Sequence, residues 1–415
     1  KVRFNYDGYY QQRIDTPYIK ENQKLSISNW EESLKVLKDK LKTLKPLALI
    51  GEHVDLETGY AIKKFMSNYG KDNVECRTDN HAILESLDSY RFNTPLNDIE
   101  NSDLIILLGT NPKIETPIIN HKIFKAYNND AKVFNIGENI SLNYKTEYLG
   151  ENLSSLNNEN LIKALKKSTN PLIIIGSAFL NKIKNIKTLK SIFSYADKYK
   201  VITKEKNNLN FLNPYASRVG QLIIGNTTNN LCEPFSNLKK DNFELVLSFG
   251  SEHIANEQFN NCFKVYFGHH GDDGAMGSDI VLPTPLYTEK NGTFVNIEGR
   301  PQEAKKCHNP IGSAKEEWSI LKKLSDELSF DFIPNTFDQL RSELFDKHPI
   351  LSDYHEIIAV ENSTSITPDI EFEDCKAEYP VSNFYMSDVI SKNSVTMAKC
   401  VEEIISTPSL LEKSA

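Results

Sequence analysis

The stretch Leu104-Ile105-Ile106-Leu107-Leu108-Gly109-Thr110-Asn111-Pro112 decides the class of fold. Five consecutive apolar residues predict a strand buried on both faces, and Gly109 ends that strand at a tight turn. An amphipathic stretch at 118–127 then predicts a helix. A buried strand, a turn and a covering helix together form the repeating unit of a doubly wound parallel sheet.

The same unit recurs on both sides of this stretch. Further strands are expected at 47–50, 74–77, 132–136, 171–175, 243–249 and 263–267, and further helices at 30–44, 58–69, 161–167 and 186–199. The pattern predicts an α/β protein with two doubly wound, Rossmann-like lobes at 46–165 and 166–290. A junction segment with a helix would precede them at 1–45. A hairpin and helix at 291–348 and an acidic extended tail with a terminal helix (389–405) at 349–415 would follow.

Composition excludes several classes of protein. The 415 residues are 39% hydrophobic and 25% charged, which is enough apolar material for a buried core. The net charge of −8 argues against a dedicated nucleic-acid binder. The longest apolar runs have about five residues, whereas a membrane-spanning helix needs roughly 20. We attribute the abundance of Lys and Asn to codon bias.

The six cysteines are widely spaced, at 76, 232, 262, 307, 375 and 400. Spacings of the CxxC, CxxxC or CxxH type are absent from the sequence, so it offers no iron–sulfur or zinc site built from local cysteine pairs. The plain interpretation is a set of reduced thiols.

Two short motifs carry polar chemistry. Backbone N–H groups at Gly109-Thr110-Asn111-Pro112 could cradle a phosphate, although a tight strand-to-helix turn is the favoured interpretation. His269-His270-Gly271-Asp272 could bind a metal or transfer protons, but neighbouring side chains diverge, so a structural loop is favoured. The sequence contains neither GxGxxG nor GxxxxGK[ST].

A third motif, from Asn291 to Arg300, looks like a hairpin element, in which Asn291-Gly292 is a strong turn signal. Charged side chains surround it and could form ion pairs there: Glu289, Lys290, Glu298 and Arg300.

The segment 268–305, with Gly268-His269-His270-Gly271-Asp272 and Tyr287-Thr288-Glu289-Lys290, resembles the molybdopterin oxidoreductase superfamily. Its form points to one branch, the large iron–sulfur (75 kDa) subunits of respiratory complex I, NADH:ubiquinone oxidoreductase. Other segments resemble that branch in the same order, namely 3–8, 28–34, 107–112, 384–391 and 396–400. The resemblance covers nearly the whole chain.

The resemblance implies a structural part of the peripheral arm of mitochondrial complex I, on the matrix side of the inner membrane. Gly109–Pro112 and His269–Asp272 would be remnants of a cofactor cleft, with no cofactor, metal or catalytic residue in this chain. The [2Fe–2S] and [4Fe–4S] clusters would lie on a partner polypeptide, the iron–sulfur half of a split subunit, beside the flavin- and NADH-binding subunits. A fragment of a longer chain is the other explanation for the missing cluster motifs.

Two other functions remain open from the sequence. The first is an active pterin-dependent oxidoreductase similar to formate dehydrogenase. The second is a nucleotide-binding module that uses the crevice between the lobes.

Overall fold

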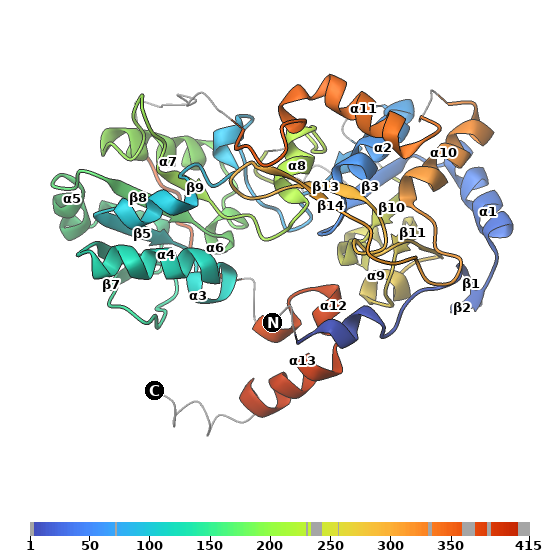
Figure 1. Cartoon of the computed structure of the whole chain (residues 1–415), viewed down its shortest axis with the longest axis horizontal. Coiled ribbons are helices and arrows are strands. Elements are labelled where there is room, and N and C mark those ends of the chain that lie inside the picture. The colour runs from blue at the N-terminus through green and yellow to red at the C-terminus, as the bar shows by residue number, and fades with distance from the viewer. Residues whose placement is uncertain are drawn as a thin grey trace.

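One parallel sheet and one mixed sheet, which lie side by side in Figure 1, form the framework of the molecule. The computed structural model describes residues 4–70, 73–229, 231–233, 243–255, 257–330, 334–358, 370–379 and 383–405. The strands are β1 Tyr18–Glu21, β2 Lys24–Ile27, β3 Pro46–Ile50, β4 Val74–Glu75, β5 Leu104–Leu108, β6 Lys132–Ile136, β7 Glu147–Gly150, β8 Pro171–Ile175, β9 Leu209–Phe211, β10 Leu245–Phe249, β11 Phe263–Gly268, β12 Ile280–Pro283, β13 Gly292–Val295 and β14 Pro301–Ala304.

The helices cover both sheets, and those expected at 30–44, 58–69, 118–127, 161–167 and 186–199 lie within three residues of the expected bounds at each end. They are α1 Trp30–Thr43, α2 Leu56–Met66, α3 Pro112–Glu115, α4 Pro117–Asn128, α5 Glu159–Leu165, α6 Ser177–Leu180, α7 Ile186–Lys198, α8 Arg218–Ile223, α9 Asp273–Met276, α10 Glu317–Leu328, α11 Phe337–Lys347, α12 Val389–Lys392 and α13 Val395–Cys400. The sequence analysis did not predict α3, α6, α8, α9 or α11. Among the described residues, no helix is both long and apolar enough to cross a bilayer.

The five-stranded sheet has the order β7-β6-β5-β8-β9, and all its strands run parallel. Every residue of β5 and β8 is buried, because apolar side chains leave both faces of these central strands. Ile106 and its neighbours pack under α5, α6 and α7. Ile105 and Leu107 pack against α4 on the opposite face, as Figure 1 shows.

The seven-stranded sheet has the order β2-β1-β12-β11-β10-β3-β4. Five of its strands run parallel, and the hairpin β1–β2 adds two antiparallel strands at one edge. One face carries the largest core, shared with α1, α2, α10 and α11. The sequence analysis missed the hairpin because its turn uses Asn22 and Gln23 at positive φ and contains no glycine.

The sheets do not follow the lobe limits expected from the sequence, 46–165 and 166–290. The chain starts the seven-stranded sheet with β1–β4, crosses to build the five-stranded sheet at 104–211, and returns at β10. Strand β10 then lies between β3 and β11 in the sheet. Strands that follow one another in the sequence are therefore not paired with one another at this point. The periodicity of apolar residues does not reveal that the chain passes from one sheet to the other and back.

The C-terminal segment also differs from the expectation of one helix at 389–405. It forms α12, a break at Asn393–Ser394, α13 and a π-helical turn at Val401–Ile405. The Ser394 hydroxyl accepts from the backbone N–H of Met397 at 3.1 Å and donates to the Asp7 carboxylate at 2.6 Å. The break thus places α12 and α13 beside the N-terminal segment (Figure 1).

Part of the expected acidic tail packs as extended chain on the five-stranded lobe. Cys375 and Ala377 join the core beneath that sheet, and Lys376 forms a β-bridge with Asn152. The remainder of the acidic stretch, 359–369 and 380–382, lies outside the described residues.

Candidate functional site: a cleft between the two sheets

A cavity of about 430 Å³ lies between the lobes, at the carboxyl ends of their strands. Glu52 and His53 follow β3 of the seven-stranded sheet, while Glu115 and Thr116 follow β5 of the five-stranded sheet. Parallel strands leave their carboxyl ends at one edge, which is where ligands bind in open α/β sheets. The C-terminal segment adds Phe384, Ser387 and Asp388 to the lining.

A second cavity of about 370 Å³ shares Glu52 and His53 with the first. Its lining includes Glu252, Asp272 and Lys392. The Lys392 ammonium pairs with the Glu252 carboxylate at 2.6 Å. The two cavities together make a cleft in which carboxylates outnumber cations.

The turn after β5 does not present a free phosphate cradle. The Glu115 carboxylate accepts hydrogen bonds from the Thr110 hydroxyl, the Asn111 backbone N–H at 3.2 Å and the backbone of Ser177. Burial raises the pKa of Glu115 to about 7, although these hydrogen bonds oppose the shift. The chain's own carboxyl group therefore occupies the donors that an anion would need.

Close packing at the same turn explains its glycine. Gly109 has φ +61°, and a Cβ there would meet the Phe179 ring at 2.4 Å. Pro112 begins the four-residue helix α3, so the Gly109–Pro112 motif makes a sharp strand-to-helix turn.

The loop His269–Asp272 ties the N-terminal segment to β11. The His270 ring bonds the Gly8 carbonyl at 2.7 Å, and the Gly271 N–H donates to the Gln12 carbonyl at 2.8 Å. Asp272 caps α9 by accepting from the Ala275 N–H at 2.9 Å. Only Asp272 of this motif lines the cleft, so the fold brings it near Glu52 and away from Gly109.

Burial shifts the protonation of this loop. It lowers the pKa of His270 to about 4 and that of His269 well below the ordinary value, so both rings are neutral at pH 7. Burial raises the pKa of Asp272 to about 6. In the described part of the chain, no three His, Cys, Asp or Glu side chains gather in a way that could hold a metal ion.

Charged groups near the predicted hairpin form ion pairs, but with distant partners. Glu289 pairs with Arg13 at 2.7 Å, and Lys290 bridges Asp55 and Glu317, each at 2.8 Å. The hairpin itself joins β13 to β14, and its turn lies at 296–300. Asn291-Gly292 instead leads into the first strand. The predicted turn position was wrong because Gly292 serves another purpose: a Cβ there would meet Asp55 at 2.6 Å.

The remaining two charges near the hairpin stay local. The Arg300 guanidinium lies 4.0 Å from the Glu298 carboxylate.

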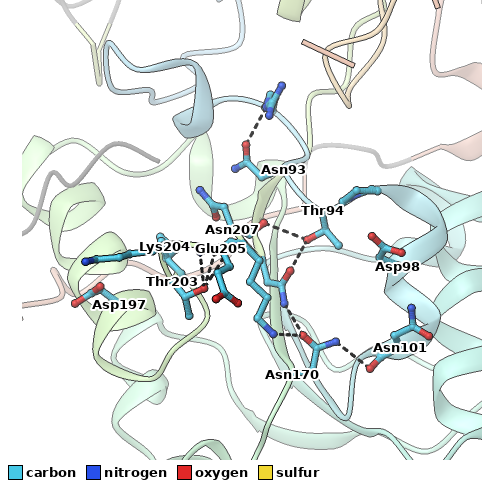
Figure 2. Close-up of a pocket in the computed structure, with 15 residues that line it drawn as sticks. Asn93, Thr94, Asp98, Asn101, Asn170, Asp197, Thr203, Lys204, Glu205 and Asn207 are labelled. Atoms are coloured by element: carbon cyan, nitrogen blue, oxygen red, sulfur yellow. Dashed lines mark hydrogen bonds between the residues drawn. The ribbon is translucent and has the colours of Figure 1, made fainter. Parts of the chain in front are cut away.

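Another large cavity, of about 1080 Å³, opens beside β9, an edge strand of the five-stranded sheet (Figure 2). Asparagine and threonine side chains dominate its lining, and they bond one another. Asn170 accepts from Asn208 at 3.0 Å and donates to the Asn101 carbonyl at 2.9 Å. The sequence analysis attributed the abundant asparagines to codon bias, yet here they form a network that joins β8 and β9 to residues 93–101.

The sequence analysis missed most of the cleft. Glu52 and His53 follow a strand-ending glycine that looked like an ordinary turn, and Asp79, Asn181 and Asn213 lie in unremarkable loops. The available signal was Glu52 itself, an acidic residue directly after a buried parallel strand.

This two-lobed α/β architecture and its inter-lobe cleft define the class of protein. Residues 13–327 match the family model Molybdopterin oxidoreductase, and the chain belongs to that family. Residues 359–400 match a second model, which describes the C-terminal part of the NADH-ubiquinone oxidoreductase G subunit. The expected family and fold class are thereby confirmed.

The relatives that match this chain are versions of one subunit of complex I. The G subunit of NADH-quinone oxidoreductase from Rickettsia bellii is 35% identical over 413 residues, covering 97% of this chain and 59% of the relative. The NADH-ubiquinone oxidoreductase 75 kDa subunit of Reclinomonas americana is 33% identical, covering 96% of this chain and 62% of the relative. The 78 kDa mitochondrial subunit of Candida albicans is 31% identical, covering 97% and 58%.

The chain is thus homologous to the molybdopterin-like C-terminal part of the bacterial G subunit and its mitochondrial 75 kDa counterpart. It spans about 60% of the length of these relatives.

Two solved structures share the fold alone. A chain of the formyltransferase/hydrolase complex of Methylorubrum extorquens has a TM-score of 0.57 at 12% identity, covering 76% of this chain and 99% of that chain. Acetylene hydratase of Pelobacter acetylenicus has a TM-score of 0.56 at 10% identity, covering 85% and 67%.

The residues of the cleft do not fit the cofactor that the family name implies. Molybdopterin carries phosphate, whereas the 430 Å³ cavity is lined by the carboxylates of Glu52, Asp79, Glu115 and Asp388 and, among the described residues, by no lysine or arginine. Among the described residues that line the two cavities there is also no cysteine to supply a thiolate ligand. Anionic nucleotides face the same electrostatic obstacle.

Proposed function

We propose that this chain is a structural part of the peripheral arm of complex I and holds no molybdenum or tungsten pterin. The similarity to complex I G subunits over 97% of the chain is the observation that carries this proposal. The acidic cleft supports the absence of a pterin. In this role, electrons pass from NADH through flavin and iron–sulfur clusters on partner chains to ubiquinone. This chain then supports the polypeptide that holds the clusters, on the matrix side of the mitochondrial inner membrane.

The N-terminal segment offers a docking surface for the iron–sulfur half of the subunit. Tyr6 and Tyr10 are 65% and 69% exposed at the start and just after the end of the short 3-10 helix Tyr6–Tyr9, which α12 and α13 contact. Large exposed aromatic rings are enriched where protein interfaces form. We place the iron–sulfur half, on a separate polypeptide, against this surface.

Affinity purification of the chain from the cells that make it tests the assignment. We expect NADH dehydrogenase activity and a separate iron–sulfur polypeptide to co-purify with the chain, with molybdenum and tungsten far below one atom per chain. A monomer without that activity would contradict membership of complex I. Stoichiometric molybdenum or tungsten would instead establish the active pterin oxidoreductase. If one longer polypeptide carries both parts, membership stands and the split does not.

Paired variants test the docking surface. Tyr6→Asp with Tyr10→Asp should reduce recovery of the iron–sulfur polypeptide, because two charges enter an apolar contact. Ile118→Asp is the matched control, since Ile118 is 70% exposed on α4 of the other lobe. Equal recovery from the two variants would remove the N-terminal segment from the interface.

A further inference from the structure

One short segment near the C-terminus borders three cavities at the inter-lobe cleft. This cleft segment runs from Phe384 to Lys392 and ends in α12. It lines the 430 Å³ and 370 Å³ cavities and also a third cavity of about 330 Å³. His53, in the loop after β3, lines all three as well. The three cavities are therefore compartments of one cleft, and the cleft segment divides them.

Ile390 anchors the cleft segment by apolar contact. Its side chain is 3% exposed and lines the third cavity together with the rings of Tyr9, Tyr287 and Phe294. A Cβ on Gly8 would collide with the Ile390 carbonyl oxygen, so the glycine allows the N-terminal segment to lie directly against α12. Removing an aliphatic side chain from water stabilises this position of the cleft segment.

Lys392 supplies a positive charge to an acidic lining. It is the one lysine or arginine among the described residues that line the three cavities. Its ammonium lies 2.6 Å from the Glu252 carboxylate. Burial acts to lower the pKa of Lys392, but the carboxylates of Glu252, Glu52 and Asp273 outweigh it and raise that pKa. The acidic cleft thus attracts a cation that the chain itself provides.

Hydrogen bonds hold both ends of α12. The Asp388 carboxylate caps its first turn by accepting from the Ser391 N–H at 3.0 Å. Just beyond the helix, the Asp7 carboxylate accepts from the Ser394 hydroxyl at 2.6 Å and from the Thr396 N–H at 3.0 Å. The cleft segment is consequently fixed at its entry into the cleft and at its exit.

The cleft segment lies outside the part of the chain that forms the sheets. Residues 13–327, which contain every described strand, match the molybdopterin oxidoreductase model, whereas the cleft segment falls within 359–400, which match the complex I model. The four hydrophobic cores take none of their described residues from beyond position 379. The sheets and their cores are therefore complete without the cleft segment.

We propose that the cleft segment is a built-in plug that closes the inter-lobe cleft to larger ligands, with Ile390 as its apolar anchor and Lys392 as its charged anchor. It lies at the carboxyl ends of parallel strands, where open α/β sheets bind ligands. Because the plug is part of the same chain, its effective concentration at the cleft is high, and a competing ligand has to displace it.

This inference goes beyond the proposed function, because support of a partner chain does not require a closed cleft, and it stands or falls separately from membership of complex I. Carboxyl labelling of the full chain with a water-soluble carbodiimide and glycinamide, measured by mass spectrometry, is the test. Glu52 reports on access to the cleft. Glu159, with 85% of its side chain exposed on α5, is the internal reference.

Ile390→Asp places a charge in an apolar contact and should displace the plug. We expect the labelling rate of Glu52, relative to Glu159, to rise about fivefold or more. Val395→Asp is the matched control, because Val395 is 54% exposed on α13, and it should change that rate less than about twofold. Equal effects from the two variants would overturn the proposal.

The charged anchor is tested in the same way. Lys392→Met should raise the labelling rate of Glu52 about twofold to threefold, because the plug loses its ion pair with Glu252. Lys399→Met removes an exposed lysine of α13 and should leave the rate unchanged. Equal rates in these two variants would remove Lys392 from the plug and overturn its assignment as an anchor.

A shortened chain that ends at Tyr379 separates a plug from a part of the core. It should keep the circular dichroism of the α/β lobes and label Glu52 at least as fast as Ile390→Asp does. A folded shortened chain with unchanged labelling of Glu52 would overturn the proposal. An unfolded shortened chain would overturn it too, because the cleft segment would then be required for folding.

Discussion

A single carboxyl group inside the cleft, Glu52, shows how the site depends on individual residues. It follows β3 and Gly51 and makes no side-chain hydrogen bond or ion pair with a described residue, and burial raises its pKa to about 8 although the Lys392 ammonium opposes the shift. An ordinary glutamate titrates near 4.5, and the native state therefore holds a proton that the unfolded chain has released. The position carries a stability cost that ligand binding or mutation can remove.

Glu52→Gln should stabilise the protein in a pH-dependent way. Below pH 4.5 Glu52 is protonated in both states, so the variant and the wild type should differ little. Between pH 4.5 and 8 only the unfolded state loses the proton, and wild-type stability falls relative to the variant. The variant's advantage should reach about 2–4 kcal/mol by about pH 9.

Urea unfolding followed by tryptophan fluorescence measures this difference. Trp30 and Trp318, the two tryptophans of the chain, lie on α1 and α10 and report on the lobe that contains Glu52. As a control, Glu159→Gln changes a carboxylate that is 85% exposed on α5, and its free energy of unfolding should follow that of the wild type at every pH. A Glu52→Gln advantage that did not change with pH would show that Glu52 ionises normally in the native state.

Residue identity predicted little of this site. Glu115 looks like any acid early in a helix, and only the fold shows that its carboxylate bonds the Thr110 turn. His269 and His270 attracted attention as a possible metal site, yet the His270 ring bonds Gly8 and the His269 carbonyl accepts from Arg13, each more than 250 positions away in sequence. Chemistry of this kind depends on long-range contacts.

At the level of elements, sequence patterns succeeded where an element is buried along its whole length. Strands β5, β6 and β8 were predicted within one residue, because short runs made mostly of apolar residues and flanked by polar ones leave few alternatives. The patterns failed at elements whose form depends on a partner. The break at Ser394 is bonded to Asp7, and β13 starts at Gly292 where the Asp55 side chain leaves no room for a Cβ.

The ion bridge of Lys290 fastens the β13–β14 hairpin to α2 and α10. Its ammonium is 5% exposed and lies 2.8 Å from both the Asp55 and the Glu317 carboxylates. Lys290→Met should lower the free energy of unfolding by about 3–5 kcal/mol, because two buried carboxylates lose their counterion. Urea unfolding monitored by tryptophan fluorescence would show the loss in this lobe.

The matched control is Lys163→Met. Lys163 pairs with Glu159 at 3.4 Å on the surface of α5, with 70% of its side chain exposed. Its loss should change stability by about 0.5 kcal/mol or less. If Lys290→Met changed the free energy of unfolding by a similarly small amount, water would have to reach Asp55 and Glu317 in the native protein.

At the scale of the whole molecule, the chain passes from the seven-stranded sheet to the five-stranded sheet and back, and this path decides which fragments can fold. Residues 82–213 contain all five strands of the smaller sheet and most of the two cores that flank it. The limits 46–165 and 166–290 cut through both sheets, separating β5 from β8 and β3 from β10.

We therefore expect the fragment 82–213 to fold alone. Circular dichroism should show α/β structure with a cooperative urea transition, because its central strands keep both neighbours. The fragments 46–165 and 166–290 should lack such a transition, since each exposes a central strand that is buried on both faces in the full chain. A folded 46–165 together with an unfolded 82–213 would contradict the observed sheet order.

The sequence by itself determined the class of fold and the family resemblance, because both depend on local runs of apolar residues and on short motifs. It also excluded iron–sulfur and zinc sites built from local cysteine pairs. Only the tertiary structure decided the strand order, the packing of the C-terminal segment over the cleft, and the acidic lining around Glu52 and Asp79. Those features join residues that are far apart along the chain, and their energies depend on burial and distance, which appear only when the chain folds.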